Sequence, residues 1–329
     1  MRGIVLVATF TVLLAACGGG TQEAEGTTPG APTSAGTMTG SATASPTPAP
    51  SVGGLGIVCG GTMEQPGIYT MREDGSGSRR ILAYGWDPAV SPEGDRIAFA
   101  VTRPGGTDLY LMKANGTHVR RLTHERRLHS DHGPAWSPDG ERIAFRHVEG
   151  RGIGRGDIWI LTLATGELAR FTNAKAHDAA PDWSPDGTKI AFASERAWAP
   201  DSEGNWDVWV KDVETGDVTR LTRNLAYESN PSWSPDGSAV AFESDRGSGR
   251  RSRIWVKELG GGVEQLTRAG RDGDREPDWS PDGSRIVFVR GSSLRVLELG
   301  DGMTVIARGT ALRTYASPNW RVARPTRKP

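Results

Sequence analysis

The chain has 329 residues, with 39 Lys and Arg against 39 Asp and Glu, and it is rich in glycine (44) and proline (21). Balanced charge argues against nucleic acid as the main partner, because no basic field is available to meet phosphates. The hydrophobic fraction of 36% allows a sizeable core and excludes disorder throughout the chain. Two cysteines can form neither a disulfide framework nor a four-ligand zinc site.

Residues 1–16 are predicted to be a secretory leader. One positive charge, Arg2, precedes an apolar run that is too short for a stable membrane span and ends in small residues. The Leu-Ala-Ala-Cys that ends at Cys17 resembles the lipobox of bacterial lipoproteins, which implies that the Cys17 thiol receives a diacylglyceryl group. An ordinary cleaved leader with a chance cysteine is the alternative. Acyl chains on Cys17 would hold the protein on a membrane surface without a spanning helix.

Residues 17–54 are predicted to be a flexible tether. Gly, Thr, Ser, Ala and Pro dominate, and only Glu23 and Glu25 are charged, so the segment cannot bury enough apolar surface to fold. Its end-to-end distance would be roughly 30–36 Å. That is enough to hold a folded domain clear of the lipid headgroups.

A repeat occupies residues 55–323. Four copies of Trp-Ser-Pro-Asp-Gly and one Val-Ser-Pro-Glu-Gly variant place their serines 46, 47, 50 and 46 residues apart. This period matches a four-stranded propeller blade. Ser-Pro-Asp-Gly favours a tight turn with a left-handed Gly, and the apolar run after each turn is typical of a buried strand. The Trp of each copy is predicted to pack between neighbouring blades.

The strand count predicts an all-β fold, a six-bladed β-propeller of four-stranded blades. The N-terminal blade, from Ile57, has only three strands of its own, with no Trp-Ser-Pro-Asp-Gly before them. Residues 317–320 carry Pro318 and Trp320 at the repeat positions and then the pattern stops. They are therefore predicted to supply the missing strand and to close the ring, which removes two open edges. Residues 324–329 form a basic tail.

The pattern Pro-x-Trp-Ser-Pro-Asp-Gly, followed by Ile-Ala-Phe and Leu-Thr, resembles the WD-like repeats of the TolB propeller family over residues 55–323. The resemblance implies a six-bladed propeller. TolB itself is a periplasmic partner of an outer-membrane lipoprotein complex, whereas this chain is predicted to have a lipidated tether where TolB has an α/β domain. Related repeats occur in peptidase propellers and pectin-fragment lyases, so the pattern does not select an activity.

The loops of the repeat differ between its two faces. The Ser-Pro-Asp-Gly turns are uniform, whereas second-to-third-strand loops and blade connections vary, as in residues 146–151, 195–206 and 250–253. Binding groups usually lie on variable loops of a rigid scaffold, so this is the predicted binding face. Trp198 and Trp206 lie there and could stack on a glycan; packing beneath a long loop is the alternative.

Four acidic residues recur five positions before the repeated Trp. Equivalence of position predicts that they surround the channel mouth, beside His132 and His177, where they could bind Ca²⁺ or the hydroxyls of a sugar. Bonds to backbone N–H groups of their own loops, or simple solvation, are the alternative. The four are Asp131, Asp178, Glu228 and Asp274.

Enzyme signatures such as a Gly-x-Ser-x-Gly elbow or a phosphate-binding glycine loop are absent from the sequence. His129, His132 and His177 could converge on a transition metal beside the four carboxylates, as a metal-assisted polysaccharide lyase or a hydrolase would require. Loop solvation of these histidines is the alternative.

The sequence therefore predicts a non-catalytic binding or scaffolding module for a protein or a cell-envelope glycan, with Ca²⁺ as the one candidate cofactor. We expect a monomer that is attached only by its lipid anchor to the extracytoplasmic face of a bacterial membrane, at the cell membrane or facing the periplasm. Cys59, in an apolar strand, is predicted to be a small core residue.

Overall fold

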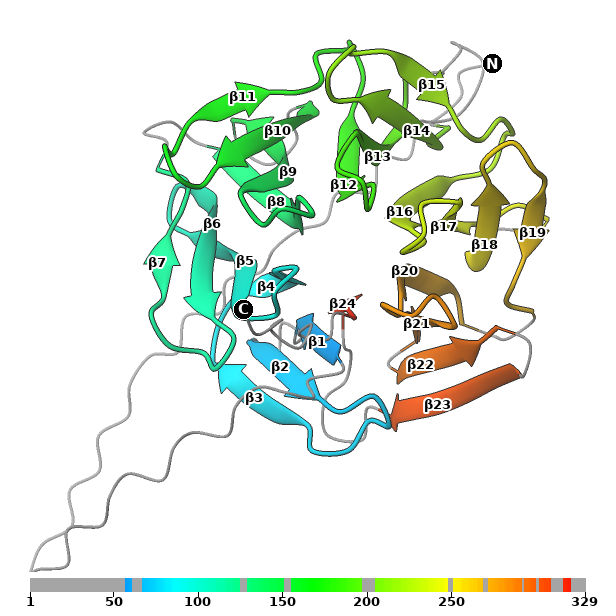
Figure 1. Ribbon diagram of the computed structural model, residues 1–329, viewed down its shortest axis with the longest axis horizontal. Helices are drawn as coiled ribbons and strands as arrows, with labels where there is room; N and C mark the ends of the chain where they lie inside the picture. Colours follow the sequence, from blue (N-terminus) through cyan, green and yellow to red (C-terminus); the bar gives the residue numbers. More distant parts are fainter. Residues whose placement is uncertain are drawn as a thin grey trace, which may run out of the picture. The chain divides into compact units, whose positions relative to one another are not determined.

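The computed structural model describes residues 57–60, 67–124, 129–150, 155–196, 205–247, 251–268, 272–291, 293–299, 302–308 and 316–320. They belong to one compact unit, Ala49–Pro329, whereas a second unit, Met1–Pro48, lies outside the described residues. The predicted leader, lipidation site, tether and basic tail also lie outside them. All regular structure in the described ranges is β (Figure 1). Within those ranges, no helix is both long and apolar enough to cross a bilayer.

Three four-stranded antiparallel sheets follow one another along residues 178–308. In each sheet the strand order is the sequence order, so that strands consecutive in the chain are neighbours in the sheet. The strands are β12 (Asp178–Trp183), β13 (Lys189–Ser194), β14 (Asp207–Asp212), β15 (Val218–Arg220), β16 (Glu228–Trp233), β17 (Ala239–Ser244), β18 (Arg253–Glu258), β19 (Val263–Gln265), β20 (Asp274–Trp279), β21 (Arg285–Arg290), β22 (Ser293–Glu298) and β23 (Gly302–Arg308).

Residues 86–170 form one eight-stranded sheet, in which a short contact between β6 and β8 joins two four-stranded groups. Its strands are β4 (Trp86–Val90), β5 (Arg96–Arg103), β6 (Gly106–Lys113), β7 (Arg120–Arg121), β8 (His129–Trp136), β9 (Arg142–Glu149), β10 (Gly156–Thr162) and β11 (Leu168–Arg170). Two parallel pairs, Gly106↔His129 and Thr107↔Ser130, join β6 to β8. Gly106 permits this contact because its φ is +145° and a Cβ there would lie 1.8 Å from the carbonyl oxygen of His129.

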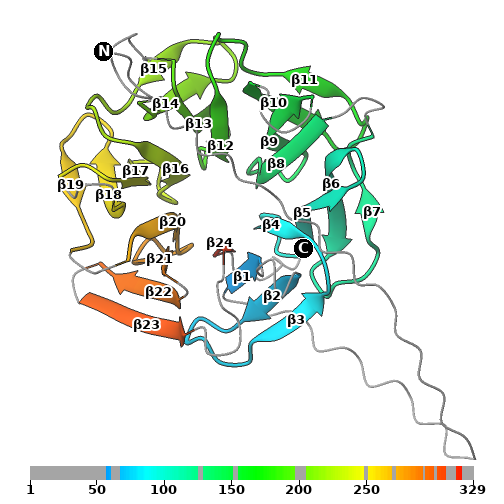
Figure 2. The same cartoon turned by 180° about the vertical axis from the view of Figure 1, so that it is seen from behind.

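One further sheet contains both ends of the described chain. Its order is β24-β1-β2-β3, with β24 (Ala316–Asn319), β1 (Ile57–Gly60), β2 (Ile68–Met71) and β3 (Arg79–Leu82). β24 pairs with β1 through Val58↔Asn319 and Gly60↔Ala316, and the two strands lie side by side in Figures 1 and 2. The C-terminal segment thus lies beside the strand at Val58, as the repeat pattern predicts.

The Ser-Pro-Asp-Gly turns have the expected conformation. Gly140 has a φ of +69°, and its N–H donates to the Ser137 carbonyl at 2.9 Å. The Ser137 hydroxyl donates to Asp139 Oδ1 at 2.5 Å and accepts from Arg142 N at 2.9 Å. Each turn therefore satisfies its own polar groups, which suits a structural role.

The repeated tryptophans pack between neighbouring groups of strands, as predicted. Trp136 is 2% exposed and clusters with Ala89 and Leu109, and its indole N–H donates to the Ala89 carbonyl at 2.9 Å. Trp320 is 1% exposed and lies in one cluster with Met71 and Val287, which belong to different sheets. Burial of such large side chains holds successive sheets together.

Candidate functional site

A pocket of about 630 Å³ is lined by residues of β4, β8, β12, β16, β20 and β24. Figure 1 shows these six strands innermost in their sheets. The lining of the pocket is chemically mixed. It combines aromatic side chains and Arg146 with the acidic residues Asp87, Asp182, Glu276 and Asp278. The pocket therefore combines apolar surface with polar groups of both signs, as binding sites commonly do.

A recurring backbone bulge shapes the pocket wall. In five inner strands, the residue before the first Pro of the repeat (two positions before the Trp position) has a φ between 47° and 55°. The strand register shifts at that point. Such bulges bend a strand and redirect its side chains. The five residues are Asp87, Gly133, Ala180, Asn230 and Glu276, and all of them line the pocket.

Aromatic rings form part of the wall. The rings of Trp86 and His132 lie 4.9 Å apart, and those of Trp206 and Tyr227 lie 6.1 Å apart. The His177 ring lies 6.4 Å from Trp206. These rings offer flat apolar faces on which a ligand could stack.

His132 is neutral at physiological pH. Burial, with Arg146 close by, lowers the pKa of His132 to about 4. The two residues are cross-strand partners in β8 and β9. Arg146 is therefore the cation of this part of the pocket, and His132 contributes an uncharged ring.

The four predicted acidic residues are buried rather than open to a ligand. Their exposed fractions are 0–1%, and each forms an ion pair or hydrogen bond with a side chain at the end of the neighbouring strand. The sequence predicts that these carboxylates surround the channel mouth, and the structure gives each of them a buried side-chain partner. The pairs are Asp131–His147 (2.7 Å), Asp178–Arg196 (2.8 Å), Glu228–Arg246 and Asp274–Arg290.

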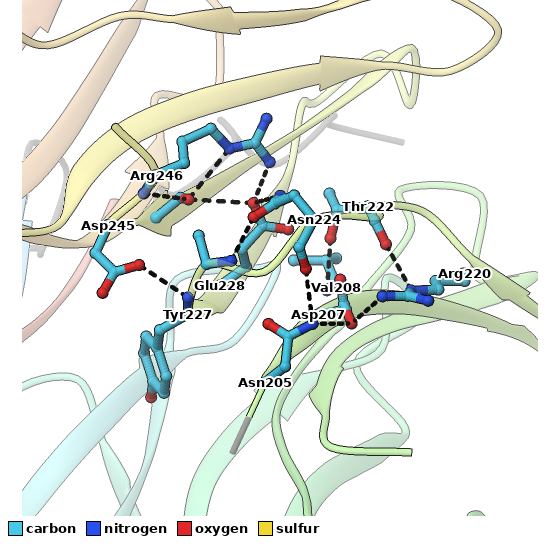
Figure 3. Close-up of polar contacts among 12 residues, drawn as sticks. Asn205, Asp207, Val208, Arg220, Thr222, Asn224, Tyr227, Glu228, Asp245 and Arg246 are labelled. Carbon is cyan, nitrogen blue, oxygen red and sulfur yellow. Dashed lines mark hydrogen bonds and ion pairs between the residues drawn. The ribbon is translucent and has the colours of Figure 1, made fainter. Parts of the chain in front are cut away.

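A second set of buried pairs lies beside the first, and Figure 3 shows one example. Asp207 accepts from Arg220 Nη2 at 2.7 Å, while Glu228 accepts from Arg246 and from Asn224 Nδ2, the latter at 2.6 Å. Burial raises the pKa of Asp207 to about 6, assisted by the charge of Glu228 and opposed by Arg220. Such a network specifies how two sheets meet and offers little to a ligand.

The three candidate histidines lie apart in the structure. Among the described residues, the one group with three ligand atoms within 4.8 Å of one another is Asp108, His129 and Asp131. His129 Nε2 lies 3.0 Å from Asp108, whose oxygens also accept from Arg103 and Arg121. These cations already neutralise Asp108, so the group is a buried charge network. His132 and His177 pack on tryptophans elsewhere.

Residues 133–310 match the TolB beta propeller domain family (PD40), and this match spans more than half of the chain. The chain belongs to the TolB β-propeller family. The resemblance noted in the repeat is thus confirmed, and its fold is an all-β propeller. No curated protein sequence matches the chain.

Solved structures support the same fold. TolB from Acinetobacter baumannii is 21% identical, with a TM-score of 0.64 over 82% of this chain and 66% of that one. A TolB-type protein of Agrobacterium tumefaciens is 21% identical, with a TM-score of 0.58 over 77% and 88%. The nidogen/laminin complex contains a chain that is 9% identical, with a TM-score of 0.65 over 83% and 100%. This chain therefore spans about two thirds of the A. baumannii TolB.

In this TolB-type propeller, two of the residues singled out from the sequence line the pocket, namely His132 and Trp206. His177 contacts Trp206, the four acidic residues are in ion pairs, and Trp198 lies outside the described residues. Sequence reasoning missed Trp86 and Tyr227, and it placed Arg146 on the predicted binding face, at the start of the variable segment 146–151, without naming it as a site residue. Arg146 carried a signal, because it replaces a small apolar residue in most copies of the repeat.

Proposed function

We propose that this TolB-type propeller is a non-catalytic binding or scaffolding module that takes its partner in the central pocket. The observation that carries the proposal is the mixed lining of that pocket, which contains aromatic and cationic residues as well as carboxylates. The aromatic and cationic residues are Trp86, His132, Arg146, Trp206 and Tyr227. A rigid scaffold that presents aromatic rings and an arginine is well suited to recognition, because these side chains dominate binding energies.

A protein partner is favoured over a glycan. The similar chain in the nidogen/laminin complex is itself part of a protein assembly. The TolB resemblance leads to the same expectation. A cell-envelope glycan that stacks on the tryptophans is the competing ligand. A lyase or hydrolase activity is less favoured, since the candidate histidines are separated from one another and buried or packed on rings.

Six blades in a closed ring are the architecture that we propose for this module. The eight-stranded sheet divides into two blades where β6 meets β8, and β24 completes the blade that begins with β1. Closure through β24 also explains why Asn319, at the end of the chain, lines the same pocket as Trp86.

A lipid anchor on Cys17 and a tether over residues 18–54 would place the module on the extracytoplasmic face of a bacterial membrane. Metabolic labelling with an alkyne fatty acid tests this directly. The full chain should incorporate the label and Cys17→Ala should not. Labelling of the variant, or of neither protein, contradicts the anchor.

Photo-crosslinking tests the binding site. A photoreactive amino acid replaces Tyr227, at the pocket, or Val218, on the outer strand β15; both side chains belong to residues that are 40% exposed. In the full-length protein in cells, crosslinks to a defined partner are expected at position 227 and not at 218. Equal crosslinking at both positions, or none at 227, contradicts binding in the pocket. Size-exclusion chromatography of the same protein should show a monomer.

Calcium remains a prediction for Asp131, Asp178, Glu228 and Asp274. Isothermal titration calorimetry with Ca²⁺ tests this prediction. It compares the parent protein with a variant in which each of the four residues is replaced by its amide, Asn or Gln. Absence of heat in the parent removes the idea. Heat that disappears in the variant would show that Ca²⁺ displaces the buried cations from these carboxylates.

A further inference from the structure

Arg146 departs from the repeat at a position that faces the central pocket. It directly follows the buried Phe145 of β9, and the residues that follow the equivalent phenylalanines are Ala100, Ala193, Glu243 and Val289. Of these five residues, Arg146 alone lines the pocket. Three of the four other residues are apolar, and the fourth, Glu243, accepts the backbone N–H of Glu276 at 3.0 Å, whereas Arg146 Nε has no hydrogen-bond partner. A charged side chain that the fold does not use in this way indicates a role beyond folding.

The guanidinium of Arg146 is incompletely paired. Its Nε is buried and donates no hydrogen bond, and in the described part of the chain no carboxylate forms an ion pair with it. Desolvation lowers the pKa of Arg146, and Tyr227 and Glu195 offset this only in part. A half-buried cation without a bonded anion is costly, and an anionic ligand group would relieve that cost.

Gly156 makes room for this arginine. A Cβ at position 156 would lie 2.3 Å from Arg146 Nε and 3.1 Å from Cγ and Cζ. The residues at the equivalent position of other copies are Thr107, Trp206 and Ser252, all of which have a Cβ. The glycine and the arginine therefore act together, and the side chain is held in the pocket by the shape of its neighbour.

The rest of the lining restricts the ligand that the arginine can take. Asp87, Asp182, Glu276 and Asp278 line the same pocket, and the carboxylates of Asp87, Asp182 and Asp278 accept backbone N–H groups. A polymer with a carboxylate on every unit, such as a polyuronate, would meet these negative charges with repulsion. A polypeptide can present a single carboxylate on a chain whose other groups are neutral or basic. The aromatic rings of Trp86 and Tyr227 can pack against its apolar parts.

We propose that the pocket binds an acidic side chain of a partner polypeptide, with the carboxylate paired to the Arg146 guanidinium. This inference rests on the proposed function and specifies the chemistry of the same site. Arg146 selects the carboxylate, His132 adds an uncharged ring, and the surrounding carboxylates favour a peptide whose other groups are neutral or basic.

Two matched peptides test the inference on the full-length protein. Acetyl-Ala-Glu-Ala-amide and acetyl-Ala-Gln-Ala-amide differ only in the charged group, and digalacturonate serves as the glycan probe. Binding is measured by ligand-observed NMR. The glutamate peptide should bind about 10-fold or more tightly than the glutamine peptide, as expected for a hydrogen-bonded charge pair.

Four variants locate the effect. Arg146→Gln should abolish the preference for glutamate, and Arg146→Lys should keep part of it because Lys retains the charge but not the planar fork. Gly156→Ala should weaken the preference by displacing the arginine without removing it. Arg142→Gln is the control, since Arg142 lies on the same strand and stacks on Trp183 outside this pocket.

Several outcomes overturn the inference. The first is that the two peptides bind equally, and the second is that the preference for glutamate survives in Arg146→Gln. The third is that digalacturonate binds more tightly than the glutamate peptide and that this binding requires Arg146. If Arg146→Gln does not fold, Gly156→Ala and Arg146→Lys decide the same question. Crosslinking from position 227 that persists in Arg146→Gln, without a glutamate preference, refutes the role of Arg146 but leaves the proposed function standing. Crosslinking that is absent from the parent refutes the function itself.

Discussion

The backbone N–H of Val90 donates a 3.0 Å hydrogen bond to Oδ1 of Asn319, which lies 229 residues further along the chain. An equivalent bond joins the N–H of Trp233 to Oδ2 of Asp182, at 2.8 Å. In both cases the acceptor directly precedes the repeated Trp of its own sheet, and the donor occupies the Trp position of another sheet. The last strand of the chain thus contacts β4 in the way that β12 contacts β16.

Removal of the Asn319 side chain should destabilise the domain, because the buried N–H of Val90 would lose its acceptor. Asn319→Ala is expected to cost roughly 1–3 kcal/mol in the free energy of unfolding. Urea denaturation at pH 7 measures the loss. Asn319→Asp keeps an acceptor oxygen and serves as the control. Equal midpoints for the parent protein and Asn319→Ala would show that this bond adds nothing.

Deletion of residues 314–329 should have a larger effect on the same measurement. It removes the partner of β1 and also Trp320, which is 1% exposed. Loss of a buried tryptophan alone costs roughly 3–5 kcal/mol. The deletion is therefore expected to lower the melting temperature of the whole domain. An unchanged melting temperature would contradict the closed ring proposed above.

The buried pair Asp178–Arg196 should be far more important for stability than an exposed pair. Asp178 has an exposed side-chain fraction of 0%, so Arg196→Ala leaves an uncompensated buried charge. Breaking such a pair costs roughly 3–5 kcal/mol. The control is Lys189→Ala, which breaks the looser pair with Asp212, at 3.8 Å, and is expected to cost about 1 kcal/mol or less. Similar losses in the two variants would mean that burial of Asp178 has no energetic role.

Asp207 should make the stability of the domain depend on pH. Its pKa is raised from 3.8 to about 6 in the folded protein, mainly by burial. Its contribution is therefore fully present below pH 3.8 and is lost as the pH rises through about 6. Between pH 3.8 and about pH 6, the urea midpoint should fall less steeply with rising pH in Asp207→Asn than in the parent. The exposed Asp217→Asn should follow the parent, and a parallel profile for Asp207→Asn would contradict the assignment.

Cys59 should be chemically inert in the folded protein. It is fully buried, and desolvation raises the pKa of its thiol well above the ordinary value. The reactive thiolate is therefore absent at neutral pH. Iodoacetamide should leave Cys59 unmodified in the native protein and alkylate it in urea, as mass spectrometry would show. Rapid native labelling would place Cys59 outside the core.

Local chemistry made much of the fold predictable. The Ser-Pro-Asp-Gly turns contain their own hydrogen bonds. The Trp and Phe of each repeat are large enough to define a core wherever the repeat occurs. The C-terminal strand was also predictable, because Pro318 and Trp320 keep the repeat spacing. The parallel contact of β6 with β8 was not, since it depends on a hairpin that extends to Gly106 and on the path of the following connection.

The candidate site was less predictable, because its residues meet only in three dimensions. The partner of Asp178, Arg196, lies 18 residues away, just beyond the end of β13. The sequence alone therefore suggested a Ca²⁺ or sugar ligand, or else backbone bonds or solvation, where the structure has an ion pair. A recurrent Ser-x-Arg, in Ser194–Arg196 and Ser244–Arg246, was the available clue. Trp86 and Tyr227 are distant in sequence and line one pocket only because the inner strands face each other.

The pairing of β24 with β1 also determines when the domain can finish folding. β1, the first strand in the described part of the chain, receives its last neighbour only when residues 316–319 have been made. Until then one edge of β1 exposes unpaired backbone groups, which invite pairing with other chains. If the predicted leader directs export, that edge emerges first on the far side of the membrane, so envelope chaperones and proteases would meet the chain in its most vulnerable form.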